Sequence, residues 1–172
     1  YAYTIYNDDL KIFNIANPAN PQEVGTYSIG YDVGDIFAAG NYLYLAEKTN
    51  QFQWQMQIIN VSNPAAPVVS GSCAFSATPS ELTVSGGTAL VTAMRHGLYT
   101  FDVSKPAAPR LLKRYDFSWA PVDVLVTGNR AYVADAYGEL KVFDIAAPTS
   151  PVLLGTYVTF TTISALAVSG NY

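Results

Sequence analysis

One twelve-residue unit occurs four times in this sequence and constrains its fold more than any other feature. The copies read LKIFNIANPANP, MQIINVSNPAAP, LYTFDVSKPAAP and LKVFDIAAPTSP, and their first prolines stand at residues 18, 64, 106 and 148. The intervals between these prolines are therefore 46, 42 and 42 residues. Such a fixed period predicts a repeat protein in which each unit packs on its neighbours.

A second motif alternates with the first at the same intervals. It places Gly-Asn or Gly-Gly between two β-rich runs, at residues 40–41, 86–87, 128–129 and 170–171. Gly and Asn tolerate the positive φ of tight turns, so each pair predicts a β-hairpin. In the third repeat the two motifs together predict four strands, with the first innermost and the fourth at the outer edge, over residues 81–85, 89–94, 98–103 and 110–116.

Four antiparallel strands in about 42 residues are typical of one blade of a β-propeller. The sequence thus predicts an all-β fold of four four-stranded blades, each 42–46 residues long. Two alternatives remain for the ring: the four blades form a closed four-bladed ring, or they are part of a larger ring of seven or eight blades. The chain is expected to form a single propeller domain or segment whose repeat units span about 1–35, 36–81, 82–123 and 124–165. Residues 164–169 are expected to supply the innermost strand of the first blade.

The units LYTFDVSKPAAP at 98–109 and LKVFDI at 140–145 resemble the LVIVD repeats. That family forms propellers and is known mainly from bacterial and archaeal surface or secreted proteins. Asn14 and Asn60 stand where the family favours Asp, and either side chain can accept a hydrogen bond from the turn that follows. The resemblance implies the fold and a cell-surface or extracellular location, and it carries no common activity.

Composition excludes some partners. The net charge is −4 with only nine Lys and Arg, which offers no basic stripe for a phosphate backbone, so nucleic acid is not an expected partner. No apolar run approaches the roughly 18 residues needed to span a bilayer, so no membrane insertion of this segment is expected. Because the chain begins at Tyr1, a longer parent protein is expected, with self-association or the remaining blades of a longer chain as further contacts.

Three carboxylates share one repeat-equivalent position near the start of the innermost strand. They are Asp35, Glu81 and Asp123, with Ala165 at the fourth position. Converging on one channel mouth, they could bind a hard cation such as calcium, the one cofactor that the sequence suggests. The favoured interpretation is structural: each carboxylate would accept backbone hydrogen bonds and hold adjacent blades in register.

Aromatic residues gather in loops that a propeller places on one face. The four-residue excess of the first interval lies in residues 48–55, which read KTNQFQWQ. Aromatics among amides on a rigid scaffold suit sugar rings or a protein partner. The alternative is that these aromatics shield the core. The candidate ligand-binding residues are Tyr31, Phe52, Trp54, Trp119 and Tyr137.

No catalytic signature is present. His96 is the only histidine, which argues against zinc and against a catalytic triad, and it is interpreted as a surface turn residue. The sequence therefore predicts a non-catalytic binding or scaffold module that recognises a protein or a carbohydrate through the loop face. Two alternatives remain: a carboxylate- or cation-dependent enzyme acting on a polysaccharide, and a purely structural repeat module.

Overall fold

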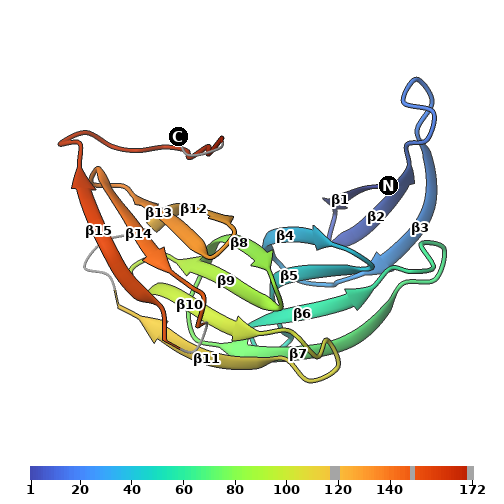
Figure 1. Cartoon of the computed structure of the whole chain (residues 1–172). Helices are drawn as coiled ribbons and strands as arrows, with labels where there is room; N and C mark the ends of the chain where they lie inside the picture. The colour runs from blue at the N-terminus through green and yellow to red at the C-terminus, as the bar shows by residue number, and fades with distance from the viewer. Residues whose placement is uncertain (117–120, 148–149, 170–172) are drawn as a thin grey trace.

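The computed structural model describes residues 1–116, 121–147 and 150–169, which form fifteen β-strands arranged in four antiparallel sheets. The sheets stand side by side in an open arc (Figure 1). Each sheet pairs its strands in chain order, as a propeller blade does. The prediction of an all-β fold with four propeller blades is confirmed. In these described ranges no helix is long and apolar enough to cross a membrane.

The blades follow one another along the chain. The first has three strands, β1 (Ala2–Tyr6), β2 (Asp9–Asn14) and β3 (Gln22–Ser28). The second has four, β4 (Val33–Ala39), β5 (Tyr42–Lys48), β6 (Trp54–Asn60) and β7 (Val68–Phe75). The third contains β8 (Pro79–Ser85), β9 (Thr88–Ala93), β10 (Gly97–Asp102) and β11 (Arg110–Tyr115). The fourth contains β12 (Pro121–Thr127), β13 (Arg130–Asp135), β14 (Glu139–Asp144) and β15 (Val152–Val158).

The glycine pairs form the hairpins that the sequence predicts. Gly40, Gly86 and Gly128 have φ angles of 56°, 56° and 54°, in the left-handed region that glycine adopts without strain. Each joins the innermost strand of a blade to the next strand, β4 to β5, β8 to β9 and β12 to β13. The fourth pair, at residues 170–171, lies outside the described residues.

The repeated Asp or Asn caps the turn that follows the third strand of each blade. Its Oδ1 accepts a hydrogen bond from the backbone N–H two residues later, over 2.9 to 3.0 Å, in Asn14, Asn60, Asp102 and Asp144. Asn and Asp therefore do the same work at this position, as the sequence predicts. The turn leads into the loop that carries the two prolines, called here the proline loop: residues 15–21 in the first blade, 61–67 in the second and 103–109 in the third.

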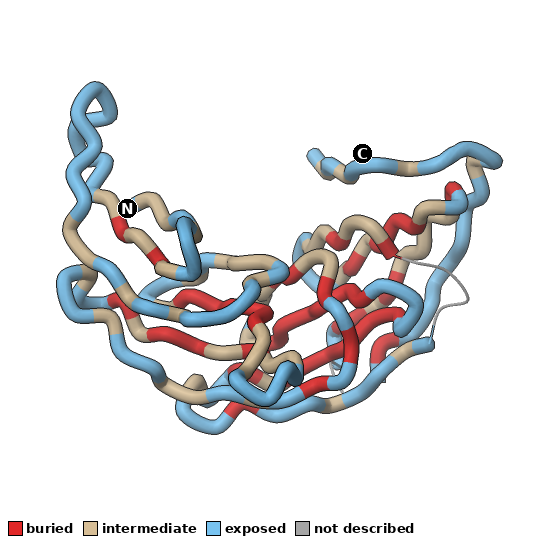
Figure 2. Tube along the Cα trace, turned by 180° about the vertical axis from the view of Figure 1, so that it is seen from behind, coloured by how far each residue is buried: buried red, intermediate tan, exposed pale blue. Residues whose placement is uncertain are grey.

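The core lies between neighbouring blades. One cluster joins the first blade to the second, a larger one joins the second to the third, and another joins the third to the fourth. The central strands β9 and β10 are almost entirely buried, whereas the outer strands β3 and β15 are largely exposed (Figure 2). A blade hydrophobic on both faces needs a neighbour on each side, which explains why the repeats stack.

The two ends of the arc depart from the expected closure. Residues 164–169, predicted to be the innermost strand of the first blade, form no strand, and the first sheet has three strands. Because the arc is open, β1 and the C-terminal segment lie apart (Figure 1). The predicted unit boundaries at residues 35, 81 and 123 fall inside β4, β8 and β12, each of which begins two residues earlier.

Candidate functional site

The three repeat-equivalent carboxylates lie on the innermost strands, beside a break in strand register. The pairing of β4, β8 and β12 with their neighbours shifts immediately before Asp35, Glu81 and Asp123. Such a β-bulge re-aims the side chain that follows it. Because β4 contacts β8 and β8 contacts β12, these positions lie where the innermost strands of neighbouring blades meet.

Two of these carboxylates join their blade to the next stretch of chain in the same way. Oδ2 of Asp35 accepts the backbone N–H of Leu82 over 2.6 Å, and Oδ1 accepts the N–H of Ile36 over 2.8 Å. Oδ2 of Asp123 accepts the N–H of Leu166, also over 2.6 Å. Leu82 and Leu166 each lie one repeat beyond the strand that carries the aspartate. Charge-assisted bonds of this kind hold neighbouring blades in register.

Glu81 has a different environment. Burial, together with the negative charges of Asp35 and Asp123, raises the pKa of the Glu81 carboxyl to about 7, and a hydrogen bond with Asp35 acts in the same direction. Burial also raises the pKa of Asp35. Among the described residues, no three His, Cys, Asp or Glu side chains are grouped to hold a metal ion. Glu81 thus shares a hydrogen bond with Asp35, whereas Asp35 and Asp123 each accept backbone N–H groups.

Glu81 gives the chain a pH-dependent stability. The pKa of Glu81 is about 7 in the folded chain and 4.5 in the unfolded chain, so the folded state binds the Glu81 proton more tightly. The resulting stabilisation of the folded state is complete below pH 4.5 and is lost as the pH rises through 7. Between pH 5 and pH 8, the stability of Glu81→Gln should fall less than that of the wild type. We expect this difference to be about 1 kcal/mol, a figure reduced for partial solvent screening. Urea unfolding at the two pH values measures this difference.

Glu23→Gln is the control, because the pKa of that exposed carboxyl is lowered and it titrates below this window. An unchanged pH dependence in Glu81→Gln would contradict the assignment.

In the second and third blades, the loop that precedes the blade lies beside the loop between its second and third strands, as the sequence predicts. The backbone N–H of Met94 donates to the carbonyl of Thr78 over 3.1 Å, which links the two loops of the third blade. The N–H of Lys48 donates to the carbonyl of Asp32 over 2.9 Å in the second blade. These loops therefore form one face of the arc, called here the loop face.

The loop that joins β5 to β6, residues 49–53, is fixed by its own hydrogen bonds. The hydroxyl of Thr49 accepts the N–H groups of Gln51 and Gln53, and its carbonyl accepts the N–H of Phe52 over 2.9 Å. This arrangement places Phe52 at a φ of 58° with its side chain 78% exposed. A left-handed, solvent-exposed aromatic residue is costly for stability alone, and such strain clusters at binding sites.

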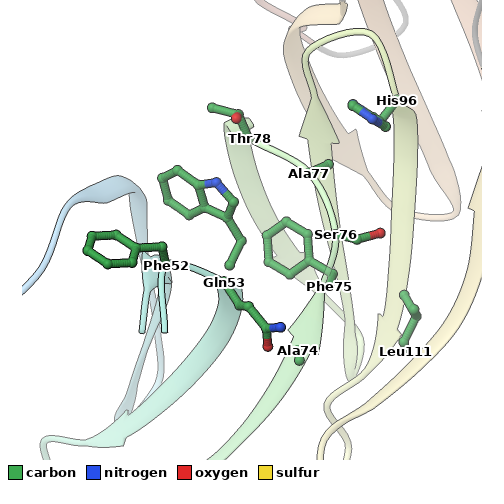
Figure 3. Close-up of a pocket in the computed structure, with 10 residues that line it drawn as sticks. Phe52, Gln53, Ala74, Phe75, Ser76, Ala77, Thr78, His96 and Leu111 are labelled. Atoms are coloured by element: carbon green, nitrogen blue, oxygen red, sulfur yellow. The ribbon is translucent and has the colours of Figure 1, made fainter. Parts of the chain in front are cut away.

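A cleft opens beside this loop, between the second and third blades. It has a volume of about 630 Å³. Figure 3 shows that its walls come from both blades, with Phe52 on one side and His96 and Leu111 on the other. The lining residues are Phe52, Gln53, Trp54, Ala74, Phe75, Ser76, Ala77, Thr78, His96 and Leu111.

The aromatic part of the lining is anchored to the strands. Trp54 begins β6 and pairs in register with Phe75 at the end of β7. The Nζ of Lys48 lies 5.3 Å from the centroid of the Trp54 ring and also pairs with Asp32, which holds the indole in place. Phe75 packs against Tyr99 and belongs to the core cluster between these blades. Trp54 and Phe75 are thus held in place before any ligand arrives.

Two of the five predicted binding residues meet in this cleft, namely Phe52 and Trp54. Tyr31, in the loop before the second blade, and Tyr137, in the fourth blade, are exposed on the loop face but do not line the cleft. Trp119 lies outside the described residues. Sequence reasoning took His96 for a surface turn residue; it is exposed in a turn, yet it lines the cleft. His96 lies more than 40 residues from Phe52 in the sequence, so no local pattern indicates that the two residues line the same cleft.

Solved structures with a similar fold include two computationally designed proteins and BBS1N. The chain aligns over 99% of its length with 52% of the computationally designed Ika8 protein, at 12% identity and a TM-score of 0.73. It aligns over 83% of its length with 82% of the designed Ika4 protein, at 11% identity and a TM-score of 0.66. It aligns over 92% of its length with 49% of BBS1N, at 16% identity and a TM-score of 0.68. The structure of BBS1N was determined in complex with ARL6DN and soaked with lead. The chain thus spans about half the length of Ika8 and of BBS1N.

No curated protein matches the chain in sequence. The model of the LVIVD repeat matches it four times, over residues 1–29, 30–74, 79–117 and 121–159. These four matches cover most of the chain and coincide with the four blades. The chain therefore belongs to the family of LVIVD-repeat proteins.

Proposed function

We propose that this chain is a non-catalytic binding module that holds a neutral carbohydrate in the cleft between its second and third blades. The observation that carries the proposal is the lining of that cleft, which combines fixed aromatic rings with amide and hydroxyl groups. A cleft of about 630 Å³ is within the usual size range of small-molecule sites. A repeat propeller scaffold suits such a role, because its rigid blades position the loops that recognise the ligand.

The rings and polar groups match the two surfaces of a sugar. A pyranose ring has apolar C–H patches that stack on aromatic faces, which Phe52 and Trp54 offer. Its hydroxyl groups need donors and acceptors, which the Gln53 amide and the hydroxyls of Ser76 and Thr78 supply. Aromatic side chains with few rotatable bonds provide this contact at low entropic cost.

Charge favours a neutral ligand and argues against catalysis. Of the ten described lining residues, none is Asp, Glu, Lys or Arg, and His96 alone is titratable. An acidic polysaccharide would find no cation in this lining. Glycoside hydrolysis needs a pair of carboxylates beside the scissile bond, and the inner carboxylates Asp35 and Asp123 accept backbone hydrogen bonds elsewhere.

The cell-surface or extracellular location belongs to the same proposal. The family resemblance supports it, and glycans exposed at cell surfaces are the ligands that such a module would meet there.

Binding to an array of neutral and acidic oligosaccharides tests the function. We expect a neutral oligosaccharide to bind, and Phe52→Ala to weaken its affinity at least about tenfold, because loss of one central aromatic contact costs about 1.4 kcal/mol or more. Phe160→Ala is a matched control: Phe160 is also exposed at a positive φ, of 59°, but does not line the cleft. Trp54→Phe, which keeps an aromatic at the strand start, should weaken binding to a smaller extent.

Three results would overturn the proposal. Equal losses in Phe52→Ala and Phe160→Ala would place the ligand elsewhere. Capture of a protein without any glycan would replace the carbohydrate with a protein partner. Turnover of a polysaccharide that is lost in Asp123→Asn while the fold stays intact would make the chain an enzyme.

A further inference from the structure

A second pocket lies between the third and fourth blades, at the opposite end of the strands from the loop face. Its volume of about 300 Å³ is at the lower end of the usual range for small-molecule sites. The turn between β8 and β9 contributes to it from the third blade, and the turn between β12 and β13 and the residues after β14 contribute from the fourth. The described lining residues are Ser85, Gly86, Thr88, Gly128, Asn129, Ile145 and Ala146.

The repeat explains why this pocket is open. Thr88 begins β9 at the position that Tyr42 takes at the start of β5, directly after the glycine hairpin. Side chains alternate across a strand, so Tyr42 shares a face with Tyr44, and Thr88 shares a face with Leu90. Tyr44 belongs to the core cluster between the second and third blades, and Leu90 belongs to the one between the third and fourth. Tyr42 and Thr88 therefore face corresponding junctions, one blade apart.

The chain fills the earlier of these two junctions with a phenol ring of its own. Tyr42 packs against the core cluster that contains Val103, the residue directly after β10. Ile145 holds the same position after β14 and lines the pocket. Because Thr88 is much smaller than Tyr42, room is left between the third and fourth blades where the preceding junction holds a ring. The pocket thus corresponds to the place of a tyrosine side chain.

The chemistry of the lining suits a neutral phenol. Ile145 and Ala146 offer apolar contact to the ring. Ser85, Thr88 and Asn129 bring hydroxyl and amide groups, which can donate to and accept from a phenolic hydroxyl. None of the seven described lining residues is charged, so an ionised ligand would find no counter-charge among them.

We propose that the junction between the third and fourth blades binds a small neutral phenol, which takes the place that Tyr42 fills one junction earlier. A free phenolic compound and the tyrosine side chain of a peptide share this chemistry. The site is separate from the carbohydrate cleft, because the two share no described lining residue.

Titration with p-cresol, followed by amide nuclear magnetic resonance, tests the site. We expect shift changes at residues 85–88, 128–129 and 145–146, with a Kd of about 1 mM or lower. Toluene lacks the hydroxyl and should bind at least about tenfold more weakly, because the polar groups of the lining would stay unpaired. Glycyl-tyrosyl-glycine, titrated in parallel, separates the two sources. Binding as tight as that of p-cresol identifies a tyrosine side chain as the ligand, and weaker binding identifies a free phenol.

Two substitutions at residue 88 place the ligand in the pocket. Thr88→Tyr supplies the ring that the second blade has, and it should abolish the p-cresol shifts while circular dichroism shows a folded chain. Thr88→Val keeps the shape of the side chain but removes its hydroxyl, so it should weaken p-cresol binding at least about threefold. Thr83→Val is the matched control, because Thr83 is similarly buried but does not line the pocket.

Three results would overturn the site. Shift changes confined to residues 52–54 and 74–78 would place p-cresol in the carbohydrate cleft instead. Shift changes that persist in Thr88→Tyr, or equal affinities of Thr88→Val and Thr83→Val, would place it on another surface. An unchanged spectrum up to the solubility limit of p-cresol would exclude a phenol as the ligand.

Discussion

Gly25→Ala will destabilise the chain by about 2–4 kcal/mol, because its new methyl group meets the backbone of the neighbouring blade. The added Cβ would lie 1.8 Å from the Pro64 carbonyl oxygen and 2.9 Å from the carbonyl carbon. A flexible side chain could move aside, whereas this loop is held by its proline and by the Asn60 cap. The first blade would have to shift relative to the second, which opens the core cluster between them. Urea unfolding followed by circular dichroism measures the loss.

Gly155→Ala is the matched control for Gly25→Ala. It is the same substitution at the same register position in the fourth blade, where the added Cβ meets nothing within 4 Å. Its stability should stay within about 0.5 kcal/mol of the wild type. Equal effects of the two substitutions would contradict the close contact between Gly25 and the proline loop of the second blade.

Asp35→Ala will cost about 2–3 kcal/mol, because it removes the carboxylate that accepts two backbone N–H groups. Leu82 belongs to the next blade, so its N–H loses the bond that crosses the junction, and Ile36 loses its partner in the same strand. Asp116→Ala is the control, since that carboxylate is exposed and pairs only with Arg114 among the described contacts. Its cost should be below about 0.5 kcal/mol.

A second readout separates the cross-blade bond from a general loss of packing. The charge and hydrogen bond of Asp35 both raise the pKa of Glu81, so Asp35→Asn should lower that pKa from about 7 toward its ordinary value. Carboxyl titration by nuclear magnetic resonance follows this shift. Two results together would contradict the proposed role of the inner carboxylates. They are a stability cost of less than about 1 kcal/mol for Asp35→Ala and an unchanged Glu81 pKa in Asp35→Asn.

Features that recur in every repeat could be predicted from the sequence. The glycine hairpins, the caps at Asn14 and Asp102 and the outer position of the fourth strand each depend on a few neighbouring residues. Local chemistry decides such features, so a repeat displays them several times. The four-residue excess around Phe52 could also be placed, because a single irregular interval stands out against a fixed period.

The cleft and the closure of the ring depend on contacts between repeats, which the period does not reveal. Phe52 and His96 line the same cleft only because the second and third blades pack at a particular angle. The same small angle, summed over the junctions, decides whether four blades close or remain an arc. The pKa of Glu81 has a similar origin, since it depends on the charges of Asp35 and Asp123 in two neighbouring blades.

The central claim is that the cleft between the second and third blades binds the ligand, and amide hydrogen exchange with and without the selected neutral oligosaccharide tests it most directly. Because the cleft is lined by residues 52–54, 74–78 and 96, the account predicts added protection in the loops that carry them. The corresponding loops of the fourth blade, including Tyr137, should exchange as before. Protection centred on the fourth blade, or unchanged exchange at the cleft under saturating oligosaccharide, would contradict the account.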